Sequence, residues 1–340
     1  MPTTIQDVIR ILEETAPPAY QEEYDNSGFL CGDLRREVQG VLVCLDTTEA
    51  VLEEAARLGC NLVVSHHPIL FKGLKRLTGA TYVERVVMQA IRQDIALYAI
   101  HTNLDSMYVN GVNSRIAQQL ELLHTRVLAP KEVWRQVRLP LPTALLEPFR
   151  SGLAANGGGE LLSALPGAGA EELLCELRFD AARQKTVEKY IAALHPPALQ
   201  RAVWQHALGP HPGVGGGMIG ELPLAMSGTD FLHYLKARMQ TQCVRHTALP
   251  GRAIRRVAVC GGAGSFLLKA AIAQGADAYV SADFKYHEFF DADGQLLIAD
   301  IGHYESEQFT INLLQEIISS NFSNFAVYCA KTMTNPVQYS

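Results

Sequence analysis

The chain has 340 residues, of which 48% are hydrophobic and 19% charged, the proportions of a soluble globular protein long enough for more than one domain. Its net charge of −6 and pI near 6.0 argue against a broad nucleic-acid-binding face. The sequence shows no N-terminal signal pattern and no uncharged apolar stretch of the roughly 18 residues that a membrane-spanning helix needs. Because the seven cysteines are scattered without CxxC spacing, we expect no disulfide framework and a reducing, cytoplasmic location.

The first third of the chain alternates predicted strands and helices. The predicted strands are residues 38–45, 61–65 and 95–100, and the predicted helices are 48–58, with Thr47 as N-cap, 82–92 and 112–120. Strands interleaved with helices of this length predict a largely parallel sheet.

The sequence between about residues 130 and 250 is richer in glycine and proline, including Gly215-Gly216-Gly217. Residues 172–179 alternate like a strand, and residues 184–194 predict a helix. A further helix is predicted at 229–239. The last part returns to the earlier pattern, with predicted strands at 254–260, 278–281, 296–299 and 325–329, a helix at 265–274, and a helix from Asp300 onward.

His66 and His67 end the predicted strand 61–65 and precede Pro68. Strand ends in open α/β sheets are common places for ligand and metal sites, and imidazole is the commonest side-chain metal ligand. Adjacent residues of an extended chain point to different sides, so this pair suits two neighbouring metal ions better than one. Taken alone, a His-His pair remains weak support for metal binding.

Two other polar groups also follow predicted strands. His303 and Glu307 are four residues apart, so on a helix they share one face and can chelate a divalent cation. The alternative is a surface pair that caps the helix. After the strand 95–100, Asp105 supplies a carboxylate able to bridge two metals, although Asn103 and Asp105 could also be ordinary turn and N-cap residues.

Four segments carry a resemblance to a known family: SHHPILFKG, HTNLDS followed by GVN, SADFKYHEFFDA and DIGHYESE. They resemble the signature segments of the NIF-three-like family, which also bears the label "GTP cyclohydrolase I type 2 homologue". The match covers residues 1–125 and 251–340 in the family's order. It implies a dinuclear metal centre held by His66, His67, Asp105, His303 and Glu307, and a symmetric homo-oligomer, most simply a hexamer.

The resemblance also implies an α/β fold of two layers, with a metal domain built from both chain ends and an inserted α+β module. On this basis residues 1–128 and 229–340 form the two halves of the metal domain, and residues 129–228 form the insert. The chain departs from the family at Tyr24, where the family has Trp, and at Ser281-Ala282-Asp283, where it has Thr-Gly-Asp. These changes put the shape of the substrate in doubt.

Further residues are candidates for the pocket around the metals. His101 is expected to face substrate or to support the ligands, because two ions already have five protein donors. Asp283 and His287 either line the pocket or belong to a capped amphipathic helix, and Lys72 either binds substrate phosphate or is solvated. Asp25 and Asn26 either lie at the site or close a turn. The glycine-rich run at 261–264 could cradle phosphate or simply form a tight turn.

These residues lead to a hypothesis of metal-dependent hydrolysis, in which hydroxide held between two divalent ions attacks a small-molecule substrate. Mixed histidine and carboxylate donors suit Zn²⁺, Fe²⁺ or Mn²⁺. The expected substrate is a nucleotide or another phosphorylated or heterocyclic molecule, with GTP cyclohydrolase-like chemistry implied by the family label. Asp105, Glu307 and His101 are the candidate catalytic residues. The competing hypothesis is a non-catalytic metal-binding or regulatory scaffold.

Overall fold

The computed structural model describes residues 2–155, 158–167, 169 and 171–340. The chain forms two compact units, which we call the two-sheet unit and the insert. The two-sheet unit combines the residues up to Ala129 with those from Pro212 onward, and the insert is Pro130–His211. The mixed α/β fold expected from the sequence is confirmed.

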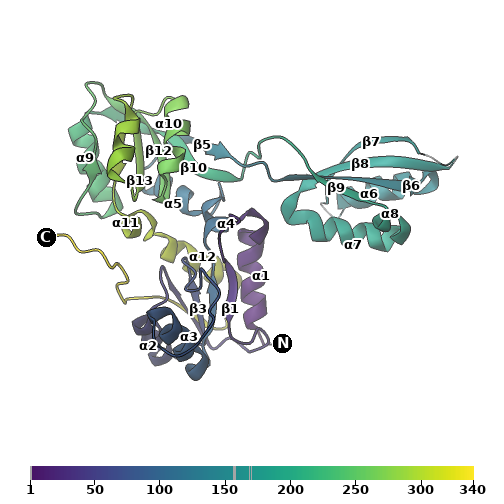
Figure 1. The fold of residues 1–340 in the computed structure, drawn as a ribbon, viewed down its shortest axis with the longest axis horizontal. Helices are drawn as coiled ribbons and strands as arrows, with labels where there is room; N and C mark the ends of the chain where they lie inside the picture. Colours follow the sequence, from purple (N-terminus) through teal and green to yellow (C-terminus); the bar gives the residue numbers. More distant parts are fainter. Residues whose placement is uncertain (1, 156–157, 168, 170) are drawn as a thin grey trace. The chain divides into compact units, whose positions relative to one another are not determined.

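The first sheet of the two-sheet unit has the order β1-β4-β3-β2-β15. Figure 1 labels its strands β1 and β3. Its strands are β1 (Gly28–Cys31), β2 (Gly40–Cys44), β3 (Leu62–Ser65), β4 (Ala96–Ala99) and β15 (Ala326–Cys329). All neighbouring pairs are parallel except β1 with β4. Because β15 pairs with β2, the two ends of the chain share one sheet.

The second sheet has the order β11-β14-β13-β12-β10-β5. Its strands are β5 (Leu123–Pro130), β10 (Gly215–Met226), β11 (Arg245–His246), β12 (Ile254–Ala263), β13 (Ala278–Ala282) and β14 (Leu297–Asp300). The pairs β12 with β13 and β13 with β14 are parallel, and β10 runs antiparallel to β12. The sheet therefore has a parallel centre, whose strands share one carboxyl end.

The helices of the two-sheet unit are α1 (Ile5–Thr15), α2 (Glu49–Arg57), α3 (Tyr82–Gln93), α4 (Thr102–Asp105), α5 (Val112–Gln119), α9 (Gly228–Met239), α10 (Leu268–Ala273), α11 (His303–Glu307) and α12 (Thr310–Asn321). Short 3₁₀ helices are η1 (Pro18–Tyr20), η4 (Ser265–Leu267) and η5 (Tyr286–Ala292). Helix α2 begins after Thr48, whose hydroxyl accepts a hydrogen bond from the Val51 amide, so the N-cap is one residue later than the predicted Thr47. No helix within the described residues is both long and apolar enough to cross a bilayer.

Alternating side chains build separate cores on the two faces of each sheet. In the first sheet, Val41 and Val43 of β2 face a core shared with α1, α5, α9 and α12, while Leu42 faces the core under α2 and α3. In the second sheet, Val280 joins the shared core and Tyr279 joins a third core with α10. A strand buried on both faces reads as a continuous apolar run, which explains why the sequence predicted these strands well.

The insert is a four-stranded antiparallel sheet of order β7-β8-β6-β9 with helices on one side. Its elements are β6 (Trp134–Pro142), η2 (Thr143–Leu145), α6 (Leu146–Ala155), β7 (Glu160–Pro166), β8 (Glu172–Asp180), η3 (Ala181–Arg183), α7 (Gln184–Leu194), α8 (Pro196–Gln200) and β9 (Val203–His206). Its core consists of apolar side chains such as Val137, Phe149 and Leu177. The insert thus has a hydrophobic core of its own.

Two expectations differ from the structure. The insert ends at His211 rather than at residue 228, because β10 pairs with β12 in the second sheet. Gly217 has a φ of +63°, and a Cβ there would lie 2.8 Å from the Val259 carbonyl oxygen, so this glycine serves a close contact between β10 and β12. Asp300 ends β14 instead of starting a helix, which begins at His303.

Candidate metal centre

The candidate metal centre lies where parallel strands of both sheets end. In the first sheet, Asp46 follows β2, His66 and His67 follow β3, and His101 follows β4 and precedes Asp105 on α4. In the second sheet, Asp283 follows β13, and β14 is followed by α11, which carries His303 and Glu307. Carboxyl ends of parallel strands gather at one edge of a sheet, which is the usual place for ligands in open α/β folds.

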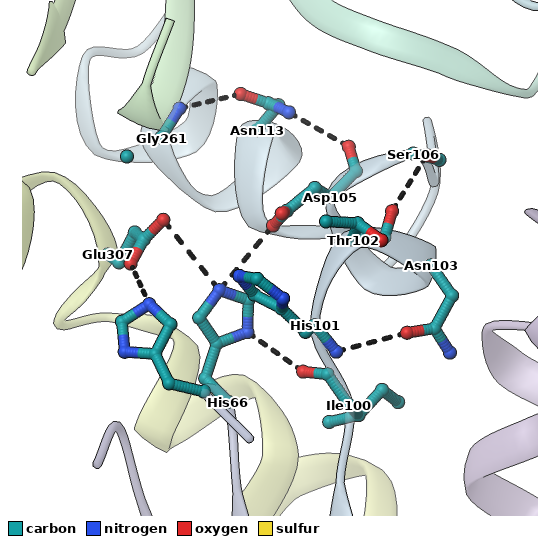
Figure 2. Close-up of polar contacts among 12 residues, drawn as sticks. His66, Ile100, His101, Thr102, Asn103, Asp105, Ser106, Asn113, Gly261 and Glu307 are labelled. Carbon is teal, nitrogen blue, oxygen red and sulfur yellow. Dashed lines mark hydrogen bonds and ion pairs between the residues drawn. The ribbon is translucent and has the colours of Figure 1, made fainter. Parts of the chain in front are cut away.

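Glu307 lies at the centre of the group. Its Oε1 is 3.7 Å from His66 Nε2, and its Oε2 is 2.9 Å from His67 Nε2 and 3.2 Å from His303 Nε2. Asp105 Oδ1 approaches the same His66 nitrogen at 3.5 Å. Figure 2 shows the Asp105 and Glu307 carboxylates both directed at His66. The structure therefore brings together residues that are more than 200 positions apart in the sequence.

The donor atoms form overlapping groups that could hold metal ions. One group is His66, Asp105 and Glu307, a second is His67, His303 and Glu307, and a third is His66, His67 and His101, with donor atoms within 4.8 Å of one another in each. All five residues proposed as ligands from the sequence belong to these groups, and so does His101. Glu307 is common to the first two groups, whereas Asp105 belongs to one.

Each of the four histidines uses Nδ1 to bind an acceptor outside the donor groups. The acceptors are Ile100 O for His66 at 2.9 Å, Asp46 Oδ1 for His67 at 2.8 Å, Asp25 Oδ1 for His101 at 2.8 Å, and Asp283 Oδ2 for His303 at 2.6 Å. Partners of this kind fix the orientation of a metal-binding imidazole and leave Nε2 as its donor atom. The four rings are thus oriented as metal-ligating histidines are.

The electrostatics of the centre favour positive charge. Burial lowers the pKa of His67, but contacts with Asp46 and Glu307 outweigh burial and raise it to about 9. Burial also lowers the pKa of His303, but contacts with Asp283 and Glu307 outweigh it and raise this pKa to about 11. Burial alone would raise the pKa of Glu307, yet the surrounding histidines hold it well below its ordinary value. A divalent cation would supply the positive charge that these carboxylates favour.

Three buried atoms of the centre lack a hydrogen bond within the described residues: His66 Nε2, Asp105 Oδ1 and Glu307 Oε2. The nearby nitrogens and oxygens are close to them but not in hydrogen-bond geometry. Buried polar atoms are normally paired, because leaving one unpaired costs about 1–3 kcal/mol. Since these atoms face one another in a set of nitrogen and oxygen donors, the centre fits bound transition-metal ions.

The absence of a side chain at Gly262 leaves space for the Glu307 carboxylate. A Cβ at Gly262, where φ is +65°, would lie 2.4 Å from Glu307 Oε1, so a larger residue would displace the carboxylate. The amides of Gly261 and Gly262 donate to Asn113 Oδ1 at 3.0 Å and Ser306 Oγ at 2.9 Å. These two amides are therefore occupied within the protein, and the structure supports the packing role of this glycine-rich run over a phosphate cradle.

The other residues proposed from the sequence occupy varied positions. Asp25 accepts from His101, Ser27 and Thr102, so its carboxylate holds other side chains in place. Asn26 donates to the Leu70 carbonyl. Lys72 lies in the exposed segment after His67, and His287 packs its ring against Tyr286 on η5. Asp283, which has a φ of +58°, accepts from His303.

Two supporting residues escaped the sequence analysis. Asp46 orients His67, and Asn113 joins the two sheets by donating to the Asp105 carbonyl and accepting from Gly261 (Figure 2). Asp46 does carry a signal, because it follows a predicted strand as the ligands do. Asn113 belongs to the GVN of the second signature segment, but the sequence assigned it no role, because that role depends on the contact between α5 and β12.

The chain is similar to known proteins over almost its whole length. The sequence model of the Duf34/NIF3 (NGG1p interacting factor 3) family matches residues 3–336. A Bacillus subtilis protein named GTP cyclohydrolase 1 type 2 homolog is 29% identical over 98% of both chains, and a Staphylococcus aureus protein of the same name is 31% identical over 98% of this chain and 99% of its own.

Solved structures show the same relationship. A Bacillus cereus protein related to NIF3 covers 100% of both chains with a TM-score of 0.79 and 29% identity. A Staphylococcus aureus protein covers 100% of this chain and 99% of its own, with a TM-score of 0.80 and 30% identity. The resemblance found in the signature segments is confirmed, and the chain belongs to the Duf34/NIF3 family.

Proposed function

We propose that the protein is a dinuclear metal-dependent hydrolase that acts on an anionic small molecule. The observation that carries the proposal is the pair of donor groups that share Glu307. His66 and Asp105 would hold one ion, His67 and His303 the other, and Glu307 would contribute to both groups. Bound there, divalent ions would lower the pKa of water toward neutrality and stabilise charge on attacking and leaving oxygens.

His101 is the residue best placed to assist the reaction directly. Its ring lies 5.3 Å from the rings of both His66 and His67, and Asp25 holds its Nδ1. Its Nε2 therefore carries the free lone pair, which can accept a proton from water or substrate and pass it to a leaving group. The ring centroids of Phe71 and His101 lie 5.7 Å apart with the rings nearly perpendicular, so Phe71 helps to shield this position.

The segment after His67 supports an anionic substrate. Lys72, Lys75 and Arg76 are exposed, and none forms an ion pair within the part of the chain that the structure describes. The exposed Phe71 and Leu74 lie among them. Cations interleaved with apolar side chains suit a molecule that has both a phosphate and a planar ring. The GTP cyclohydrolase name of the relatives points to the same class, nucleotides.

The test is a substrate screen of chain that has been stripped of metal and reloaded with Zn²⁺, Fe²⁺ or Mn²⁺. Nucleotides, phosphoesters and cyclic amides are offered to the wild type, to Asp105→Asn and to His246→Ala, an exposed histidine outside the centre. We expect turnover of at least one anionic class, its loss in Asp105→Asn and its retention in His246→Ala. Undiminished activity in Asp105→Asn would place the chemistry elsewhere. Two tightly bound ions without turnover of any class would favour the scaffold.

A further inference from the structure

The segment that follows β15, residues 330–340, crosses from the first sheet to the helix that carries two candidate ligands; we call it the strap. It leaves the sheet at Ala330, whose amide donates to the Val43 carbonyl at 2.9 Å. Its far end reaches Gly302 at the start of α11, where a Cβ would lie 2.7 Å from the Tyr339 hydroxyl. The strap therefore spans the edge at which the candidate metal centre is built.

Glu54 of α2 anchors the start of the strap. Its buried carboxylate accepts hydrogen bonds from the Lys331 amide at 2.9 Å, the Thr332 amide at 2.9 Å and the Thr332 hydroxyl at 2.6 Å. Burial raises the pKa of Glu54, but these hydrogen bonds outweigh it and leave the pKa below its ordinary value. A buried charge that is satisfied by three donors from one segment holds that segment in a defined position.

The next residues of the strap reach both halves of the candidate metal centre. The Thr334 hydroxyl donates to Asp46 Oδ2 at 2.7 Å, while Oδ1 of the same carboxylate binds His67 Nδ1 at 2.8 Å. Asn335 Nδ2 donates to Glu305 Oε1 at 3.0 Å, and Glu305 lies on α11 between His303 and Glu307. Each oxygen of Asp46 is thus tied to one partner, which prevents the carboxylate from rotating away from the imidazole.

We propose that the strap is a positioning element of the metal centre, in which Thr334 fixes Asp46 and thereby His67 for one of the two ions. The inference rests on the dinuclear centre proposed above. It adds that a segment without any candidate ligand supports the centre, because Thr334 holds the carboxylate that orients His67. The loss of Thr334 should therefore affect only one of the two ions. His66 is held by the Ile100 carbonyl, so the ion of the His66 and Asp105 group does not depend on Thr334.

The experiment is calorimetric titration of metal-free full-length chain with Co²⁺, followed by the absorption spectrum of the bound ion. Thr334→Val keeps the shape of the side chain and removes the hydroxyl. We expect one of two binding steps to weaken roughly tenfold, the low end for loss of an outer-shell partner, and the other step to stay unchanged. Thr334→Ser should restore the weakened step. Met333→Ala, which changes a neighbouring exposed side chain, is the matched control.

The outcomes separate the strap from the centre. If Thr334→Val binds both ions with the affinities of the wild type, the proposed role of the strap is wrong, but the metal centre is unaffected. Equal weakening of both binding steps would contradict the role of the strap in the same way. Fewer than two ions bound by the wild type would overturn the centre itself. Should Thr334→Val fold poorly, carboxypeptidase digestion of the wild type with and without Co²⁺ replaces it. Coupling between sites is reciprocal, so Co²⁺ should slow release of the last residues, and equal release rates would overturn the strap.

Discussion

The two compact units differ in what they bury. In the insert, the buried side chains are apolar, among them Leu139, Phe149 and Leu177, and none of its described polar or charged residues is buried. The two-sheet unit holds all the buried polar and charged residues of the described chain. Among them, His66 and Glu307 belong to the candidate metal centre, and Asp25, Asn113 and Ser306 lie around it.

This difference teaches where to look for function. An apolar interior stabilises a fold at about 25 cal/mol per Å² of buried apolar surface and needs no specific partners. Burial of a charge opposes folding unless the charge is paired, so retained buried charges need a reason other than stability. Glu307 belongs to the candidate metal centre, whereas the buried Glu54 is paired with three donors of the strap. The insert offers no comparable group within the residues described.

The largest expected effect comes from Glu307→Ala. Because Glu307 is common to two donor groups, its loss should remove both ions, whereas loss of a histidine should remove one. Metal analysis of purified protein by plasma mass spectrometry measures the content directly. His246→Ala serves as control and should retain the wild-type amount. Equal metal content in Glu307→Ala and the wild type would end the assignment of the centre.

A core truncation in the insert should have a different signature. Leu177→Ala removes a fully buried side chain and should destabilise the insert by about 2–5 kcal/mol. Metal content should not change, because Leu177 belongs to the core of the other unit. Differential scanning calorimetry and metal analysis of the same sample test both parts. A parallel loss of metal would show that the units are not independent.

Glu54→Gln tests whether one buried charge of the two-sheet unit stabilises it through the strap. Folding lowers the pKa of Glu54 below its ordinary value of 4.5. The carboxylate therefore stabilises the protein fully at pH values above 4.5, and this stabilisation is lost as the pH falls through the lowered pKa. The variant should therefore melt at a lower temperature than the wild type at pH 7. The gap should narrow as pH falls below about 4. Parallel curves from pH 7 to pH 3 would contradict this role.

The smallest expected effect is from replacement of the insert. Strands β5 and β10 flank it and are neighbours in the second sheet, so a short Gly-Ser linker can join them. We expect the shortened chain to bind the same number of ions as the full chain. A loss of bound metal in a folded product would break the comparison, because it would give the insert a part in the centre.

Features that depend on neighbouring residues in the sequence, such as single strands and the spacing of residues on one helix, could be predicted from the sequence. The predicted strands 61–65 and 95–100 correspond to β3 (Leu62–Ser65) and β4 (Ala96–Ala99), because a short, continuous apolar run needs a sheet buried on both faces. His303 and Glu307 share a helix as their spacing predicted. In contrast, the pairing of β15 with β2 and the link from Asn113 to Gly261 join segments far apart in the chain. No local pattern contains that information.

The order of the ligands along the chain has a consequence for biosynthesis. His303 follows His67 by 236 residues, which a ribosome adds in roughly 10–50 s at about 5–20 residues per second. During that time β2 lacks its β15 neighbour, and His66 and His67 lack Glu307. A nascent chain therefore offers only three of the five candidate ligands, namely His66, His67 and Asp105. The candidate metal centre is therefore complete only late in synthesis, after the emergence of α11 and the closing of the first sheet by β15.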